Sequence, residues 1–84
     1  MYKDGNSIDL HDIKYQNEMV TNIHGKYKNK YFYYDNKKIK IYSKDKSLLP
    51  NNGQKITIIQ AHIGFFKNKA QLIIYNKKDI KVTP

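Results

Sequence analysis

Apolar and polar residues alternate with a period of two along most of the chain from residue 18 onward. Successive side chains of a β-strand point to opposite faces, so this pattern predicts strands with one buried face. The predicted strands occupy residues 18–28, 30–35, 38–43, 55–66, 70–76 and 79–82. The only prolines, Pro50 and Pro84, lie outside these segments, and we expect an all-β protein.

Two of the predicted strands are long, and each contains an irregularity. In 18–28, Gly25 marks a bend or a β-bulge. In 55–66, the apolar alternation changes phase at Ile59, and one extra residue in a bulge would reconcile the two halves. Small, strongly coiled barrels need such bends, so these irregularities favour a barrel.

Two segments do not follow the strand pattern. Residues 7–14 predict a single helical turn, capped by Ser7. Its partial apolar side consists of Ile8, Leu10 and Ile13. Residues 44–53 predict a short helix or turn between the third and fourth strands, ended by Pro50 and Gly53.

The segments 30–35 and 38–43 form the clearest hairpin. Its turn covers residues 35–38, where Asn36 tolerates a positive φ. The expected cross-strand pairs are Asp35 with Lys38, Tyr34 with Ile39, Tyr33 with Lys40, Phe32 with Ile41 and Tyr31 with Tyr42. A slip by one residue would bury lysines, so the two faces of the hairpin are well specified.

The hairpin places its rings on two different faces. The apolar face, which belongs in the core, carries Phe32, Tyr34, Ile39 and Ile41. The opposite face carries Tyr31, Tyr33, Lys38, Lys40 and Tyr42. Bases could stack on such rings while the lysines meet phosphates. The high strand propensity of tyrosine offers a purely structural explanation for the same residues.

The net charge is +9, from 16 basic residues and 7 acidic ones, and every basic residue is a lysine. Because a net positive charge this high is unusual for a small chain, nucleic acid is the first partner to consider. Lys, Asn, Ile and Tyr all have AT-rich codons, so a biased genome would also enrich them. Glu codons are A-rich as well, yet Glu18 is the only glutamate, and codon bias alone does not explain that.

The length of 84 residues predicts a single domain over 1–84, with a lead-in over 1–17 and a barrel over 18–82. No cysteine is present, so neither a disulfide nor a thiolate can contribute. The first residues lack the apolar core of a signal peptide, and the most apolar stretch is too short to span a membrane. We expect a cytoplasmic protein without a membrane partner.

Motifs for catalysis or metal binding are missing from the sequence. His11, His24 and His62 have no zinc-ligand spacing, the serines have no nucleophile motif, and the four glycines are isolated. We expect no enzymatic activity, no catalytic residue, no metal and no cofactor.

The order of strands, with a short helix or turn between the third and fourth, resembles a small five-stranded OB-fold barrel. The segment VTNIHGKYKNKYFYYDNKKIKIY, residues 20–42, resembles the first three strands of the tRNA-anticodon-binding or single-strand-binding type of OB domain. The segment NGQKITIIQAHIGFFKNKAQLII, residues 52–74, resembles the fourth and fifth strands. The chain departs from that family at Ala61, where a glycine is usual, and at the turn Asp35-Asn36.

The resemblance implies a binding face on the second and third strands, flanked by the loops 26–30 and 65–69. The residues that it implies for nucleic-acid binding are Lys26, Lys28, Lys30, Tyr31, Tyr33, Lys38, Lys40, Tyr42, Phe66, Lys67 and Lys69. Phe65 and Phe66 are neighbours, so only one of them can face the core.

Two functions remain open on this basis. The first is binding of single-stranded nucleic acid with little sequence preference, favouring DNA over RNA because nothing identifies a 2′-hydroxyl contact. The second is a protein-interaction module that serves as an accessory domain or subunit of a larger nucleic-acid-processing protein, or that self-associates.

Overall fold

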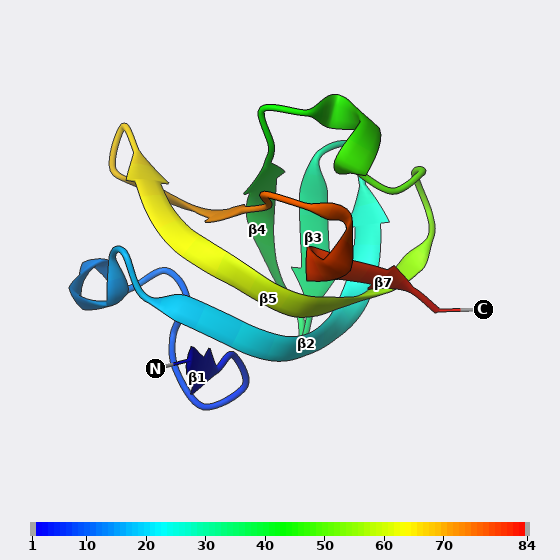
Figure 1. Cartoon of the computed structure of the whole chain (residues 1–84). Coiled ribbons are helices and arrows are strands. Elements are labelled where there is room, and N and C mark those ends of the chain that lie inside the picture. The colour runs from blue at the N-terminus through cyan, green and yellow to red at the C-terminus, as the bar shows by residue number, and fades with distance from the viewer. Residues whose placement is uncertain (1, 84) are drawn as a thin grey trace.

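The computed structural model describes residues 2–83, which form seven strands and three single turns of 3-10 helix (Figure 1). The strands are β1 (Tyr2–Asp4), β2 (Met19–Lys28), β3 (Tyr31–Tyr34), β4 (Lys37–Tyr42), β5 (Lys55–Phe66), β6 (Lys69–Ile73) and β7 (Ile80–Val82). The helical turns are η1 (Ile13–Tyr15), η2 (Lys46–Leu48) and η3 (Lys77–Asp79). The prediction of an all-β fold is confirmed.

Strands β2 to β6 close into a barrel. Along the sheet the order is β1-β2-β3-β4-β6-β5-β7, and β2 also pairs with β5 to complete the circle. Within the barrel, neighbouring strands are antiparallel except for the parallel pair of β4 with β6, and outside it β1 also runs parallel to β2. This closed five-stranded arrangement is compatible with the OB fold, as predicted. The short strand β1 pairs with the part of β2 that does not pair with β3. The short strand β7 likewise pairs with the part of β5 that does not pair with β6 (Figure 1).

The two long strands, β2 and β5, change phase together. Buried residues are Val20 and Ala61 on one side of the change, and Ile23 and Ile58 on the other. The pairing register is the same on both sides, so β5 has no extra residue relative to β2. The predicted one-residue bulge is therefore wrong. Instead, Asn22, at φ 61°, lies opposite Ile59, and these two residues are not paired in the β-ladder. At this position both strands exchange the side that faces the core.

Three hairpins are closed by two-residue turns in which both central residues have positive φ. These turns are Asn29-Lys30, Asp35-Asn36 and Lys67-Asn68. Such backbone geometry matches the right-handed twist of the flanking strands. The turn at Asp35-Asn36 also shows that the predicted register of the β3–β4 hairpin is wrong by two residues. Tyr33 pairs with Lys38 and not with Lys40.

The shift by two residues leaves every side chain on its predicted face, because the strand repeat is also two. Phe32, Tyr34, Ile39 and Ile41 are all buried, as expected. Gly25 faces the same core, and a Cβ there would lie 2.3 Å from the Tyr33 carbonyl oxygen and 2.7 Å from the Phe32 ring. Glycine thus permits the close approach of β3 to β2 and does not mark a bulge.

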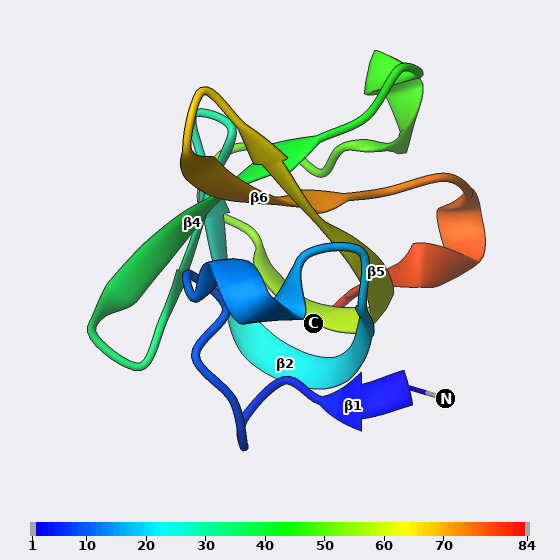
Figure 2. The same ribbon diagram turned by 90° about the vertical axis from the view of Figure 1, so that its left-hand side faces the viewer.

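The lead-in differs in part from the prediction. β1 was not predicted, and the helical turn begins after Asp12, whose side chain accepts from the Lys14 backbone N–H, and not after Ser7. Leu10 is buried in the core, whereas Ile13 is exposed. Figure 2 shows the lead-in running across the barrel between β4 and β5.

The end of the chain contains a buried carboxylate that the sequence pattern did not reveal. β6 ends at Ile73 and not at residue 76, and η3 follows. Asp79 is 1% exposed. Its two oxygens accept from the Gln60 amide at 2.8 Å and from the backbone N–H groups of Tyr75 and Asn76 at 2.8 and 3.2 Å. The bond from Gln60 attaches the last segment to β5, and the two backbone bonds fix the conformation of that segment.

The predicted short helix or turn between the third and fourth barrel strands is η2. Asp45 caps it, accepting from Ser47. The hydrogen bonds from the Ser47 hydroxyl and backbone, with the nearby Lys77 charge, lower the pKa of Asp45.

Candidate nucleic-acid interface

Lysines and tyrosines alternate across the outer face of β2, β3 and β4. One cross-strand row runs Lys28, Tyr31, Lys40, and the next runs Lys26, Tyr33, Lys38. Neighbouring strands lie about 4.8 Å apart, so each ring has a lysine stem on both sides. We call these six residues the Tyr/Lys surface. This surface forms because the two-residue turns pair the outward-facing residues of each strand with outward-facing residues of the next strand.

An open groove adjoins this surface where the β5–β6 turn meets β4 and β6. Six of the predicted residues line it: Tyr31, Lys38, Lys40, Phe66, Lys67 and Lys69. The lining also includes His11, Ile39, Asn68, Ala70 and Gln71. The parallel pairing of β4 with β6 brings these segments together, although the paired residues, such as Lys40 and Gln71, lie 31 positions apart in the chain.

The remaining predicted residues lie in two adjoining hollows. Lys30 and Tyr42 border one of them together with Lys40, which also lines the groove. Lys26, Lys28 and Tyr33 border the other, beside Asn52 and Gly53. The structure therefore brings six of the eleven predicted residues into one groove and distributes the other five around it.

The loops that flank the surface are shorter than predicted. Lys26 and Lys28 belong to β2, so only Lys30 of the three lysines lies in a turn. Phe66 ends β5 and Lys69 begins β6. The flanking loops 26–30 and 65–69 thus reduce to two-residue turns, which hold these side chains on strand ends.

Each ring of the groove lies close to a lysine ammonium. The Lys38 Nζ is 4.9 Å from the centre of the Tyr31 ring, and the Lys67 Nζ is 5.4 Å from that of Phe66. An exposed cation–π contact contributes about 0.5–1 kcal/mol. A base stacked on an aromatic side chain contributes about 1–3 kcal/mol. A base can therefore displace the ammonium favourably and leave it free for an adjacent phosphate.

Phe65 and Phe66 separate as the alternation requires. Phe65 packs against the core, and Phe66 is 60% exposed at the rim of the groove. An exposed ring beside lysines provides a hydrophobic face for a base or for a protein partner.

Carboxylates lie at the margin of this region, where Asp35 borders a hollow with Tyr33 and Lys38. The residues that line the groove include no aspartate or glutamate. Within residues 2–83, the one lysine–carboxylate ion pair joins Lys14 to Asp12, at 3.9 Å, and the His11 Nδ1 lies 3.7 Å from the Asp9 carboxylate; both contacts lie in the lead-in. Like charges also meet on neighbouring strands, since Lys26 and Lys55 are direct partners. An anion that binds here would relieve that repulsion.

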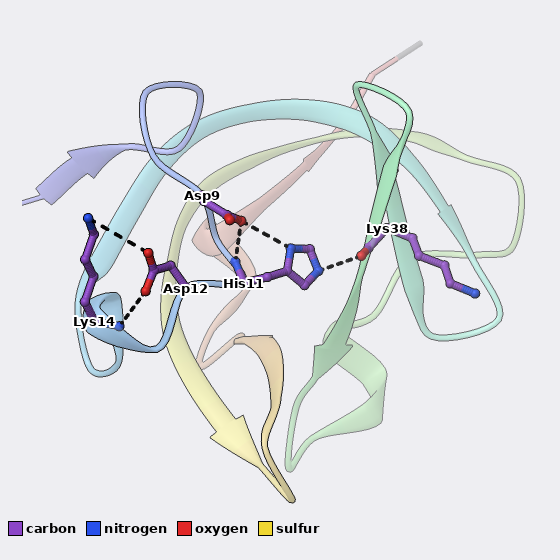
Figure 3. Close-up of polar contacts among 5 residues, drawn as sticks. All are labelled: Asp9, His11, Asp12, Lys14 and Lys38. Atoms are coloured by element: carbon purple, nitrogen blue, oxygen red, sulfur yellow. Dashed lines mark hydrogen bonds and ion pairs between the residues drawn. The ribbon is translucent and has the colours of Figure 1, made fainter.

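His11 forms one wall of the groove, which the sequence did not predict. Its Nε2 lies 2.9 Å from the Lys38 carbonyl oxygen, and its backbone N–H donates to the Asp9 carboxylate (Figure 3). A carbonyl only accepts, so Nε2 carries the hydrogen. This bond attaches the lead-in to β4. No sequence signal could have placed His11 there, because the path of the lead-in depends on tertiary packing.

The other two histidines lie away from the groove and are held by protein groups. His24 Nδ1 is 2.8 Å from the Thr57 hydroxyl, and His62 Nδ1 is 2.8 Å from the Tyr75 hydroxyl.

Over the described part of the chain, no group of three or more His, Asp or Glu side chains is arranged to hold a metal ion. None of the helical turns in residues 2–83 is long and apolar enough to cross a membrane.

Comparisons with protein-family models, with curated proteins and with solved structures found no significant match to this chain.

Proposed function

We propose that this protein binds single-stranded nucleic acid, preferring DNA to RNA, through the Tyr/Lys surface and the adjoining groove. It acts in the cytoplasm without catalysis, metal or cofactor. The observation that carries the proposal is the alternation of lysine and tyrosine across three neighbouring strands, with no carboxylate between them.

Binding follows from two kinds of contact. Unpaired bases stack on Tyr31, Tyr33 and Phe66, whose rings project from strands and so lose little freedom. Lysines on both sides of each ring meet the phosphates and release their counterions. Lysine offers donors but no planar fork, so these phosphate contacts position the strand without reading sequence. A duplex keeps its base faces stacked on each other and binds more weakly here.

The test is removal of both strand rings together. We expect Tyr31→Thr with Tyr33→Thr to weaken binding of a single-stranded DNA of about 15 nucleotides at least tenfold, since each stacked base contributes about 1–3 kcal/mol. Threonine keeps the strand propensity of these positions. The matched control is Tyr2→Thr, because Tyr2 is also an exposed strand tyrosine but lies on β1. Unchanged affinity in the double variant would refute the proposal.

The exposed Phe66 ring supports a second candidate, in which the barrel docks a larger protein or another copy of itself. The two functions respond differently to salt. Binding to phosphates weakens steeply as salt increases, whereas docking through an apolar ring does not.

A further inference from the structure

Gln71 lies on the floor of the groove, in the same cross-strand row as Tyr31. Its Cα partners are Lys40 on β4 and Gly64 on β5. The neighbouring residues of β6, Ala70 and Leu72, are buried, so Gln71 is on the outer face and is half-buried there. The amide therefore sits among the rings and lysines that we assign to nucleic acid.

The stem of Gln71 borders an open position on the neighbouring strand. Gly64 has no side chain, and a Cβ there would lie 3.9 Å from Gln71 Cγ and 2.7 Å from Ile73 Cδ1. The space above Gly64 is thus occupied by Ile73 and bordered by the Gln71 stem. Because Gln71 projects from a strand that is paired on both sides, with β4 and with β5, its backbone is better fixed than that of a residue in a loop.

The amide of Gln71 has no hydrogen-bond partner within residues 2–83. Two other glutamines are used by the fold, since Gln60 donates to Asp79 and Gln54 accepts from the Asn51 backbone, whereas Gln16 is exposed in the lead-in. Among the groove residues, the lysines can only donate, and the His11 Nε2–H is bonded to the Lys38 carbonyl. Asn68 lies in the exposed two-residue turn. Gln71 is the strand residue of the groove that can donate and accept side by side.

We infer that Gln71 reads the edge of a base stacked in the groove and gives the site a preference for adenine. This inference depends on the proposed function and deepens it. The amide oxygen accepts from the adenine N6 amino group, while the amide nitrogen donates to N7. This bidentate pairing suits adenine, whereas guanine presents two acceptors on the same edge.

The experiment compares oligo(dA), oligo(dT) and oligo(dC) of about 12 nucleotides, a length suited to one barrel of this kind. The variants are Gln71→Met, which keeps the length of the side chain, and Gln16→Met, which changes an exposed glutamine of the lead-in. A fourth probe carries 7-deazaadenine in place of adenine and so lacks the N7 acceptor. Thermal melts of each variant check that the fold is retained.

We expect the unaltered protein and Gln16→Met to bind oligo(dA) about fivefold more tightly than oligo(dT). This is the lower end of the range for a bidentate contact, because the groove is open. Gln71→Met should bind both equally, and 7-deazaadenine should weaken binding only when Gln71 is present. A preference for adenine that persists in Gln71→Met, or equal binding of all the probes by the unaltered protein, would overturn the inference alone. Failure to bind any of them would overturn the proposed function as well.

Discussion

Tyr34 offers a test of the core that requires the removal of one oxygen atom. The residue is 8% exposed, and its ring stacks on Phe32 with 5.4 Å between centres. Its hydroxyl is buried and finds no hydrogen-bond partner within residues 2–83. Tyr34→Phe keeps the ring and its stacking but removes the unsatisfied group.

The expected gain follows from the cost of that hydroxyl. Leaving a buried polar group without a partner costs about 1–3 kcal/mol relative to its hydration in the unfolded chain. We use the lower end of this range, because the structure around a single hydroxyl can relax. We expect Tyr34→Phe to stabilise the protein by about 1 kcal/mol, which raises Tm by about 4–8 °C in a domain of this size.

The same substitution at Tyr27 provides the control. Tyr27 is also buried, at 4% exposed, but its hydroxyl is not among the buried polar atoms that lack a partner, and the Lys30 backbone partly offsets the rise that burial causes in its pKa. Tyr27→Phe therefore removes no unsatisfied group, and we expect it to lower stability and not to raise it. Thermal and urea unfolding of both variants measure the two changes. If Tyr34→Phe destabilises as much as Tyr27→Phe does, the description of the Tyr34 environment is wrong.

The pH dependence of stability tests the same hydroxyl. Burial, followed by the negative charges of Asp9 and Asp35, raises the pKa of Tyr34 from 10.0 to about 12. Between pH 10 and pH 12 the unfolded chain loses this proton while the folded protein keeps it, so stability falls as pH rises. The loss over this window is about 2 kcal/mol. In Tyr34→Phe that part of the loss should disappear, and an unchanged slope would contradict the assignment.

Three further substitutions test other parts of the account. Gly25→Ala should destabilise by about 3 kcal/mol or more in a urea titration, because its Cβ would lie 2.3 Å from a carbonyl oxygen; a loss below about 1 kcal/mol would refute the close contact. Asp79→Asn should destabilise by about 2 kcal/mol, because an amide nitrogen would replace an oxygen that accepts from N–H groups, while nucleic-acid affinity stays unchanged. Lys67→Gly should keep or raise Tm, since glycine adopts the observed φ of 51° without strain, yet weaken nucleic-acid binding; a parallel loss of stability would show that the turn geometry is wrong.

The strand faces were predictable from sequence because their repeat is short and local. The pairing of Tyr33 was wrong by two residues, yet Tyr33 still lies on the predicted outer face. A register error of two residues does not change which face a side chain occupies, because side chains of a strand return to the same face every two residues. The error itself came from the turn, since Asp35-Asn36 lacks the glycine that usually marks a two-residue hairpin.

The groove was only half predictable, because it is made by topology. Phe66 and Lys67 meet Tyr31 through the parallel pairing of β4 with β6, which no local pattern encodes. His11 and Asp79 were missed for the same reason. The role of His11 depends on the Lys38 carbonyl, and that of Asp79 depends on the Gln60 amide. Both partners are distant in sequence and come within hydrogen-bond distance only in the folded protein.

The salt dependence of binding distinguishes phosphate contacts of the lysines from a purely structural role. Four lysines line the groove: Lys38, Lys40, Lys67 and Lys69. A single strand that contacts all four should bind with a slope of log K against log salt of about −2.8, since each neutralised phosphate contributes about −0.7. Lys67→Gly should reduce the slope to about −2.1 by the same rule.

The measurement is fluorescence anisotropy of a labelled single-stranded DNA of about 15 nucleotides over a range of salt concentrations, with RNA and duplex of the same sequence alongside. We predict tight binding of the single strand at low salt, with the slope given above and weaker binding of the duplex. Absence of binding at low salt, or a slope near zero, would contradict the account and leave the lysines and tyrosines with a structural role alone.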